Sequence, residues 1–297
     1  MSHIPVLLEE SIDFLRIIPS GNYFDGTYGE GGHSNVILKN LNERGRLFAT
    51  DLDLDAIEIA KKNMVDQRFS IFHSSFSNIK SLDIPHLDGA IFDFGMSSNQ
   101  LDDPSRGFSF KNNGPIDMRM NTESNASLKK WINNAPENEI ENVIKKFGEE
   151  SNAKKISRKI IEVRQNKQIN NTNDLAEIIK SVSQFKKSKI HPATKTFQAF
   201  RIFINNELDE IQKLLSSIDD MMKVGSRLVF ISFHSLEDRL IKNFFRPKKI
   251  NYPRDIPINN EIEIRYKSLG KKIRASEDEI KMNPRSRSAI LRAFEKI

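Results

Sequence analysis

The first hundred residues show two alternating patterns of hydrophobic positions. Short apolar runs predict strands, at 22–26, 45–51, 68–73 and 87–94. Around and between them, apolar residues recur every three or four positions and predict helices, at 5–16, 32–41 and 54–64. Short apolar strands that alternate with helices are typical of a parallel, doubly wound sheet, so we predict the α/β fold class.

The alternation stops after residue 94. The stretch 95–125 is rich in Gly, Ser, Asn, Asp and Pro, which predicts a long ordered loop. Helical spacing of apolar residues then predicts helix throughout 127–182, and a further helix over 194–222. The middle of the chain is therefore expected to be mainly helical.

The α/β pattern returns towards the C-terminus. A strand is predicted at 227–233, a helix at 235–245 and a last strand at 288–294. The simplest account is a helical domain inserted into one loop of the sheet. We therefore expect the α/β domain to comprise 1–110 and 195–297, with the inserted helical domain at 111–194.

Composition excludes several kinds of protein. The 297 residues contain no cysteine, which excludes disulfides, thiolate zinc sites and cysteine nucleophiles. Hydrophobic residues make up 38% of the chain, enough for a sizeable core. No apolar run approaches the roughly 18 residues of a membrane helix, and there is no signal-like N-terminus. We therefore expect a cytoplasmic protein that does not bind membranes.

Positive charge is concentrated in two segments. Segment 141–195 has 13 Lys/Arg against 6 Asp/Glu, and segment 239–297 has 16 against 7, with Tyr252 among its aromatic residues. The rest of the chain is net acidic, although the whole carries +6. Two basic segments on an acidic core favour a polyanion partner, most simply a nucleic acid. The alternative is that these helices only present solvated lysines.

The predicted turn between the first strand and its helix is glycine-rich and acidic. No P-loop string occurs in the chain, and the third glycine of a dinucleotide fingerprint that begins at Gly29 and Gly31 is replaced by Ser34. Asp25 and Glu30 would repel a diphosphate but suit a ligand that carries an ammonium and a sulfonium group. The loop therefore favours S-adenosylmethionine, with a plain tight turn as the alternative reading.

Three predicted strands end in an acid: Asp25, Asp51 and Asp93. Ligands of open parallel sheets bind at the carboxyl ends of the strands. Asp51 lies 22 residues beyond Gly29, close to the spacing of an acid that accepts ribose hydroxyls. The alternative role for Asp51 is capping the next helix, but Asp53 can supply that cap.

Several other polar and aromatic residues have both a functional and a structural interpretation. Phe76 follows the third strand and could cover an adenine ring or pack in the core. Gln198, Arg201 and Asn205 share a helix face that is either a polar site or solvent-exposed. His234 follows the fifth strand and is a substrate contact or a hydrogen-bonded structural histidine.

The stretch after the fourth strand could hold a nucleic acid base. Arg106, Phe108, Asp117 and Arg119 together provide the charge, aromatic surface and carboxylate that suit a stacked, hydrogen-bonded base. An ordinary loop with buried aromatic residues is the alternative. No His/Asp/Glu set has metal-ligand spacing, and no serine lies in G-x-S-x-G, so neither a metal nor a serine triad is expected.

Eight short strings occur in an order that is specific as a set: His3-Ile-Pro5-Val-Leu-Leu, Asp25 to His33, Asp93 to Phe110, Asp117 to Met120, Gly148-Glu-Glu150, His191 to Leu208, Ser232 to Arg239 and Asn283 to Ala289. With them the chain closely resembles the bacterial ribosomal RNA small subunit methyltransferase H family, from His3 to about Arg292. Two details depart from the common form: Glu30, and Asp-Phe-Gly-Met instead of Asp-Leu-Gly-Val at 93–96.

This resemblance implies a class I (Rossmann-like) methyltransferase core with an inserted helical domain. It implies S-adenosylmethionine-dependent methylation of the N4 amine of a cytidine in 16S rRNA of the small ribosomal subunit. The cofactor contacts that it implies are Gly31, Gly32, His33, Asp51, Phe76, Asp93 and Gln100. Our candidate substrate residues are Arg106, Phe108, Arg119, Arg201, His234 and Arg239.

The group that accepts the amine proton is left open by the sequence. Amine methyltransferases of DNA often carry an Asp/Asn-Pro-Pro-aromatic loop after strand four, and this chain has no Pro-Pro there. The backbone carbonyls of 94–97 and the carboxylate of Asp117 are both candidates. Other open alternatives are a DNA or protein methyltransferase, a silent RNA-binding assembly factor, naked RNA or assembled subunit as substrate, and a monomer or a dimer.

Overall fold

The computed structural model describes residues 5–182, 191–246 and 265–297. Two residues named above, His3 and Tyr252, lie outside these ranges. The chain forms two compact units: a core unit of Met1–Gly95 with Glu210–Ile297, and an insert unit of Met96–Asp209. The domain limits expected from the sequence, at 110/111 and 194/195, stay a prediction.

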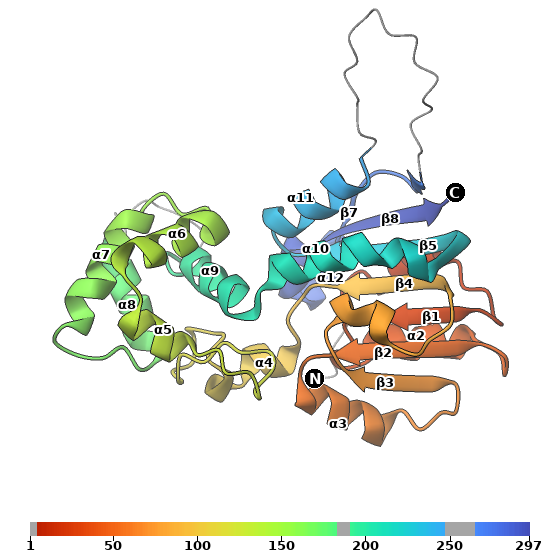
Figure 1. Ribbon diagram of the computed structural model, residues 1–297, viewed down its shortest axis with the longest axis horizontal. Helices are drawn as coiled ribbons and strands as arrows, with labels where there is room; N and C mark the ends of the chain where they lie inside the picture. The colour runs from red at the N-terminus through yellow and green to blue at the C-terminus, as the bar shows by residue number, and fades with distance from the viewer. Residues whose placement is uncertain (1–4, 183–190, 247–264) are drawn as a thin grey trace, which may run out of the picture. The chain divides into compact units, whose positions relative to one another are not determined.

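The core unit is built on one mixed sheet (Figure 1). Its strand order is β3 (Phe69–His73), β2 (Arg46–Asp51), β1 (Asn22–Asp25), β4 (Leu87–Asp93), β5 (Met222–Ser232), β8 (Ile290–Lys296) and β6 (Tyr266–Ser268). The first five strands are parallel, which confirms the predicted α/β class. The last strand, whose direction the sequence did not predict, differs from these: β8 pairs antiparallel with β5, with β6 and with β7 (Ile273–Arg274).

Side chains of successive strand residues enter the two faces of the sheet in turn. On β1, Tyr23 packs into one hydrophobic cluster and Phe24 into another. Helices α1 (Leu8–Leu15), α2 (Gly32–Asn40) and α3 (Leu54–Asn63) contribute to the first cluster. Helices α10 (Glu207–Ser217) and α11 (Ser235–Phe244) contribute to the second. Both faces are covered, which explains why the central strands read as continuous apolar runs.

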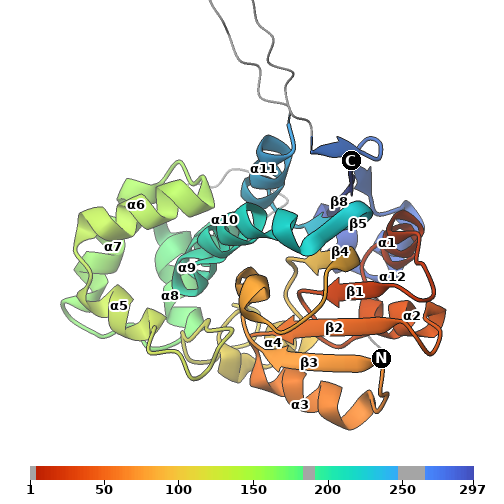
Figure 2. The same ribbon diagram turned by 45° about the vertical axis from the view of Figure 1, so that its right-hand side comes forward.

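The insert unit is a helical body with its own hydrophobic core (Figure 2). Its helices are α4 (Ser98–Asp102), α5 (Leu128–Asn134), α6 (Glu137–Gly148), α7 (Ala153–Arg164), α8 (Thr172–Val182) and α9 (Thr194–Asn205). The prediction of helix throughout 127–182 is therefore wrong, because this segment is divided into four separate helices. Pro136 separates α5 from α6, and Glu149 ends α6 in the left-handed conformation, with φ +46°.

Other boundaries also differ from the prediction. The single helix expected over 194–222 is two helices, because Asn206 adopts a left-handed conformation, with φ +51°, between α9 and α10. The long loop at 95–125 contains α4 and a 3-10 turn at Pro104–Arg106. Strand β5 begins at Met222, before Gly225, and its pairing with β4 shifts register near Gly89.

The C-terminal part holds elements that were not predicted, namely β6, β7, helix α12 (Glu277–Met282) and the 3-10 turn Pro284–Ser288. These elements are short, and none carries a strong periodic pattern. No helix within the described ranges has the length and apolar character needed to cross a membrane.

Candidate functional site

Three carboxylates lie at the carboxyl ends of neighbouring strands in the core unit. Asp25 ends β1, Asp51 ends β2 and Asp93 ends β4. Strand β1 is paired with β2 on one side and β4 on the other, so the three acids share one edge of the sheet. This is the edge at which parallel α/β sheets bind ligands.

Asp25 is almost fully buried, with 2% of its surface exposed. One carboxylate oxygen accepts a hydrogen bond from Thr27 N (3.1 Å), and the other accepts one from Ser34 Oγ (2.7 Å). Burial raises the pKa of Asp25 to about 6, although these hydrogen bonds act in the opposite direction. The carboxylate thus ties the end of β1 to the first turn of α2.

Asp51 holds the glycine turn against the end of β2. Its Oδ2 accepts a hydrogen bond from Gly29 N (2.7 Å), and its Oδ1 accepts one from Asp53 N (2.9 Å). The alternative role of helix cap belongs to Asp53, which accepts from Asp55 N (3.2 Å) at the start of α3. Burial raises the pKa of Asp51 to about 6, and the nearby charges of Asp53 and Asp25 add to the effect.

Asp93 is the least engaged of the three carboxylates. Its backbone N donates to Thr27 Oγ1 (2.7 Å), and its Oδ1 accepts from Gly95 N (2.9 Å). Among the described residues no group donates to its Oδ2. Burial raises the pKa of Asp93 to about 7, with Asp25 and Glu237 contributing by charge repulsion. One carboxylate oxygen at this edge therefore keeps its full capacity to accept.

The geometry of the glycine turn requires glycine at two positions. Gly31 has φ +77°, and a Cβ at this position would lie 2.5 Å from Tyr28 Oη. A Cβ on Gly32 would lie 2.1 Å from Cγ of Pro5. Both positions therefore exclude larger residues, one by conformation and the other because the N-terminal segment packs against it.

His33 points at the same N-terminal segment. Its ring is buried, and Nε2 lies 3.2 Å from Val6 O. The histidine thus helps to hold residues 5–7 against the start of α2. The cofactor contacts expected of Gly31, Gly32 and His33 stay predictions.

Phe76 begins the 3-10 helix Phe76–Ser81 that follows β3. The half-buried ring packs on Phe92 and Phe94, with ring centroids 6.1 Å and 5.5 Å apart. Its neighbours Ser75 and Ser77 are both buried. Part of the ring is thus packed in the core and part stays accessible, so both interpretations of Phe76 remain open.

Gln100 lies in the insert unit, where it has a local structural role. Ser97 caps α4 by accepting from Gln100 N (3.2 Å), and Gln100 Oε1 accepts from Ser97 N (3.2 Å). This reciprocal capping box satisfies two donors at the start of a five-residue helix. Sequence inspection could have found the box, because serine and glutamine stand three residues apart. The cofactor contact expected of Gln100 stays a prediction.

Asp117 and Arg119 form a two-pronged ion pair in the insert unit. Arg119 Nε and Nη2 donate to the two carboxylate oxygens, at 2.6 Å and 2.8 Å. Arg119 Nη1 also donates to the carbonyls of Thr122 and Ser124 (2.8 Å and 2.6 Å). The pair folds the 117–124 loop on itself. The candidate proton acceptor Asp117 is thus already engaged by a guanidinium.

Arg106 and Asn205 hold the same loop from two sides. Arg106 is 8% exposed, and its Nη2 donates to the carbonyls of Arg119 and Met120 (3.1 Å and 3.2 Å). Asn205 Nδ2 donates to Met118 O (2.7 Å), and Asn205 Oδ1 accepts from Met120 N (2.7 Å). These contacts are structural, and a substrate role for Arg106 stays a prediction.

Other predicted substrate residues of the insert unit are also packed or paired. Phe108 is buried, with the Arg106 guanidinium 5.9 Å from its ring centroid. Arg201 makes a two-pronged ion pair with Glu207, at 2.8 Å for both contacts. Gln198 donates to Phe147 O (3.2 Å). The polar face of α9 is therefore turned to protein groups within the insert unit.

His234 caps α11 in the core unit. Its Nδ1 accepts from Glu237 N (3.4 Å), while Glu237 Oε2 accepts from Phe233 N (2.7 Å) and His234 N (3.2 Å). A second Glu237 oxygen lies 3.1 Å from His234 Nε2. These contacts agree with the interpretation of His234 as a hydrogen-bonded structural histidine. Arg239 is exposed on the same helix.

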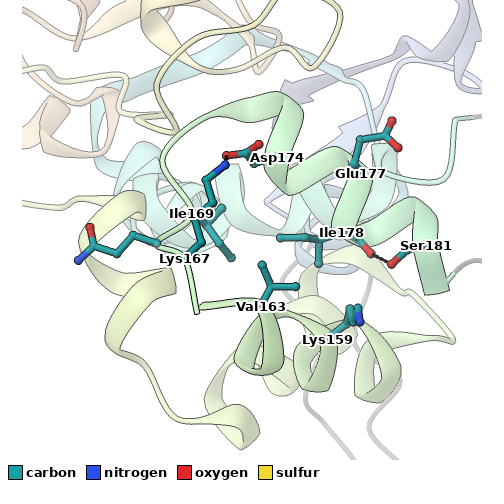
Figure 3. Close-up of a pocket in the computed structure, with 9 residues that line it drawn as sticks. Lys159, Val163, Lys167, Ile169, Asp174, Glu177, Ile178 and Ser181 are labelled. Atoms are coloured by element: carbon teal, nitrogen blue, oxygen red, sulfur yellow. Dashed lines mark hydrogen bonds and ion pairs between the residues drawn. The ribbon is translucent and has the colours of Figure 1, made fainter. Parts of the chain in front are cut away.

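The insert unit also has a cavity of about 280 Å³ between α7 and α8 (Figure 3). Val163, Ile169 and Ile178 supply apolar lining. The rim mixes charges of both signs, including Lys167, which donates to Asp174 (3.2 Å). None of the predicted cofactor or substrate residues lines it, so we do not assign the reaction to this cavity.

The exposed face of α7 is basic. Lys154 and Lys155 are exposed, as is Arg158, which lies 3.7 Å from Glu137. Lys159 is paired with Glu162 at 2.6 Å. The helix thus presents several cations beside a buried apolar stripe, and RNA binding by this face stays a prediction.

Comparison with known proteins adds the family. The family model described as "MraW methylase family" matches residues 1–297. "Ribosomal RNA small subunit methyltransferase H" of Coxiella burnetii is 46% identical over 304 residues, which cover 100% of this chain and 99% of that protein. The protein of the same name from Pseudoalteromonas atlantica is 47% identical over 306 residues, covering 100% of this chain and 98% of that protein.

A solved structure of an rRNA methylase from Streptococcus thermophilus is also similar, with 10% identity and a TM-score of 0.45, covering 100% of this chain and 99% of that one. The family assignment rests on the match along the whole chain and on the two full-length relatives. By these matches, this chain belongs to the MraW methylase family.

Proposed function

We propose that this chain is an S-adenosylmethionine-dependent methyltransferase that modifies the N4 amine of a cytidine in 16S rRNA. Membership of a methylase family supports the type of reaction. The name shared by the full-length relatives, a ribosomal RNA small subunit methyltransferase, supports the substrate class. We infer that the protein works in the cytoplasm, where small ribosomal subunits are found.

The three acids at the sheet edge carry the cofactor proposal. Asp25, Asp51 and Asp93 have raised pKa values mainly because they are buried, and charge repulsion from Asp25 adds to the effect at Asp51 and Asp93. A ligand with phosphate groups would add to this repulsion, whereas a cation would offset it. S-adenosylmethionine brings an ammonium group and a sulfonium, and the sulfonium supplies an electrophilic methyl group.

The proposed roles of the residues follow from their contacts. Asp51 keeps lone pairs beyond its two backbone hydrogen bonds and would accept ribose hydroxyls. The accessible part of Phe76 would lie against the adenine ring. Asp93 Oδ2 and the turn at Gly31, Gly32 and His33 would bind the remaining polar groups, and Gln100 belongs to the same proposed set.

The acceptor side must hold a cytosine amine whose lone pair is delocalised into the ring. The protein can contribute by positioning the amine and by accepting hydrogen bonds from its N–H groups. Because Asp117 already binds the Arg119 guanidinium, we favour the backbone carbonyls of 94–97 as acceptors. The basic face of α7 would bind RNA phosphates.

The direct test uses labelled S-adenosylmethionine and small subunits from cells that lack this modification. After incubation, nucleosides from 16S rRNA are separated and identified by mass spectrometry. We expect labelled N4-methylcytidine at one site. Label found only in ribosomal protein would refute the proposed substrate, and subunit binding without any transfer would refute the proposed catalysis. Parallel reactions with naked 16S rRNA decide which form of substrate is used.

Replacement of Asp51 by asparagine is expected to weaken S-adenosylmethionine binding about 10- to 100-fold. The variant loses a charged acceptor and places an amide donor beside N–H groups that the carboxylate now binds. Isothermal titration calorimetry measures the change. The control is Asp83→Asn, an exposed acid that precedes β4. Equal affinity of a folded Asp51→Asn variant and the unmodified chain would exclude the role.

Cofactor affinity is expected to fall as the pH is lowered from 8 to 5.5. The acids at the edge have pKa values of about 6 to 7, so they are ionised at pH 8 and progressively neutral below pH 7. A neutral carboxyl group no longer attracts a cation, and each proton that must be released costs up to about tenfold in affinity per pH unit. Titrations in buffers of different ionisation enthalpy count the protons. Asp93→Asn should flatten the profile above pH 6, and a flat profile in the unmodified chain would contradict the proposal.

Charge reversal on α7 is expected to weaken RNA binding and reduce its salt dependence. Lys154→Glu with Lys155→Glu should lower the slope of log K against log salt by about 1.4 to 1.8, the value for two lost phosphate contacts. Fluorescence anisotropy over a range of KCl concentrations measures the slope. The matched control is Lys61→Glu with Lys62→Glu on α3, which changes the net charge equally. If both pairs behave alike, α7 is not an RNA-binding face.

A further inference from the structure

Glu210 on α10 is hydrogen-bonded to the turn that follows β3. Its Oε2 accepts from the hydroxyls of both Ser75 and Ser77, the second at 2.5 Å. The two serine hydroxyls also lie 3.0 Å from each other. Glu210 is more than 130 residues away in sequence, so this contact exists only in the folded core unit.

The Glu210 carboxylate is held as an ion within the fold. Its other oxygen, Oε1, accepts from Lys213 Nζ (2.7 Å), one turn further along the same helix. The Glu210 side chain is 16% exposed, whereas that of Lys213 is 64% exposed. Burial acts to raise the pKa of Glu210, but hydrogen bonds from Lys213, Ser75 and Ser77 outweigh it and lower the pKa. Ionised acceptors make the stronger hydrogen bonds.

The two serines flank Phe76. Ser75 caps the 3-10 helix that Phe76 begins, since its Oγ accepts from Ser77 N (3.2 Å). Both serines are buried, and both are bound to one carboxylate oxygen. These hydrogen bonds hold the residues on each side of Phe76, whose ring packs against Phe92 and Phe94.

We propose that Glu210 is a positioning residue for the cofactor, which binds Ser75 and Ser77 so that Phe76 is held ready for the adenine ring. This inference rests on the proposed function, in which Phe76 lies against adenine. Glu210 is also the first residue of the core unit after the insert unit. The helix that returns the chain from the insertion thus carries the residue that orders this part of the cofactor site.

A double-mutant cycle with Glu210→Ala and Phe76→Ala tests the proposal. Glu210→Ala alone should raise the Kd and the KM for S-adenosylmethionine about tenfold, with kcat at saturating cofactor changed less than twofold. In the Phe76→Ala background, Glu210→Ala should have no further effect on Kd, because its influence passes through that ring. Calorimetry gives Kd, and methylation of small subunits gives KM and kcat.

Two further variants sharpen the test. Lys213→Ala removes the partner on the solvent side of the carboxylate and should change Kd less than twofold. Ser75→Ala with Ser77→Ala removes the two hydroxyls and should reproduce the Glu210→Ala effect. This serine pair carries the test if Glu210→Ala does not fold.

The outcomes separate this inference from the proposed function. If the unmodified chain binds S-adenosylmethionine but Glu210→Ala or the serine pair binds it equally well, the inference is overturned and the function stands. Additive losses in the Phe76 cycle also overturn it, because a general structural effect would persist without the ring. If the unmodified chain does not bind S-adenosylmethionine, the proposed function fails and the inference fails with it.

Discussion

The candidate site depends on buried carboxylates that accept hydrogen bonds from backbone N–H groups. Asp25 binds the turn that leads to α2, Asp51 binds Gly29 in the same turn, and Asp93 binds the backbone at Gly95. Three acids at one sheet edge repel one another, which is a cost that burial increases. The backbone donors offset part of that cost and fix the shape of the edge.

These three acids make the carboxyl edge of the sheet favourable for a positively charged group. The pKa values of about 6 to 7 lie above the ordinary value of 3.8, so folding favours the protonated acids, and the stability that this gives is lost as pH rises from about 4 to about 7. A cationic ligand reverses the preference because it stabilises the ionised forms. In the proposed function, the cationic ligand would offset both the cost of burying these carboxylates and their repulsion.

Several polar and charged side chains of the insert unit shape one loop. Arg106, Asn205 and the Asp117–Arg119 pair together hold the backbone of 117–124. Each of these side chains has the chemistry of a base-binding residue, but within the insert unit each is bound to protein. The lysines Lys154 and Lys155 of α7 are exposed, and in the proposed function they would meet an external polyanion.

The sequence by itself determined the succession of the main strands and helices along the core unit, the acids at the strand ends and the glycine turn. Neighbouring residues carry this information, through the spacing of apolar positions and through local turn chemistry. It also carried the family, through strings spread along the whole chain. Only the tertiary structure decided that Asn205 binds the backbone of Met118 and Met120, that β8 is antiparallel, and that Glu210 reaches Ser75 and Ser77. Those features depend on partners far apart in the chain, and no local pattern of hydrophobic and polar residues specifies such pairings.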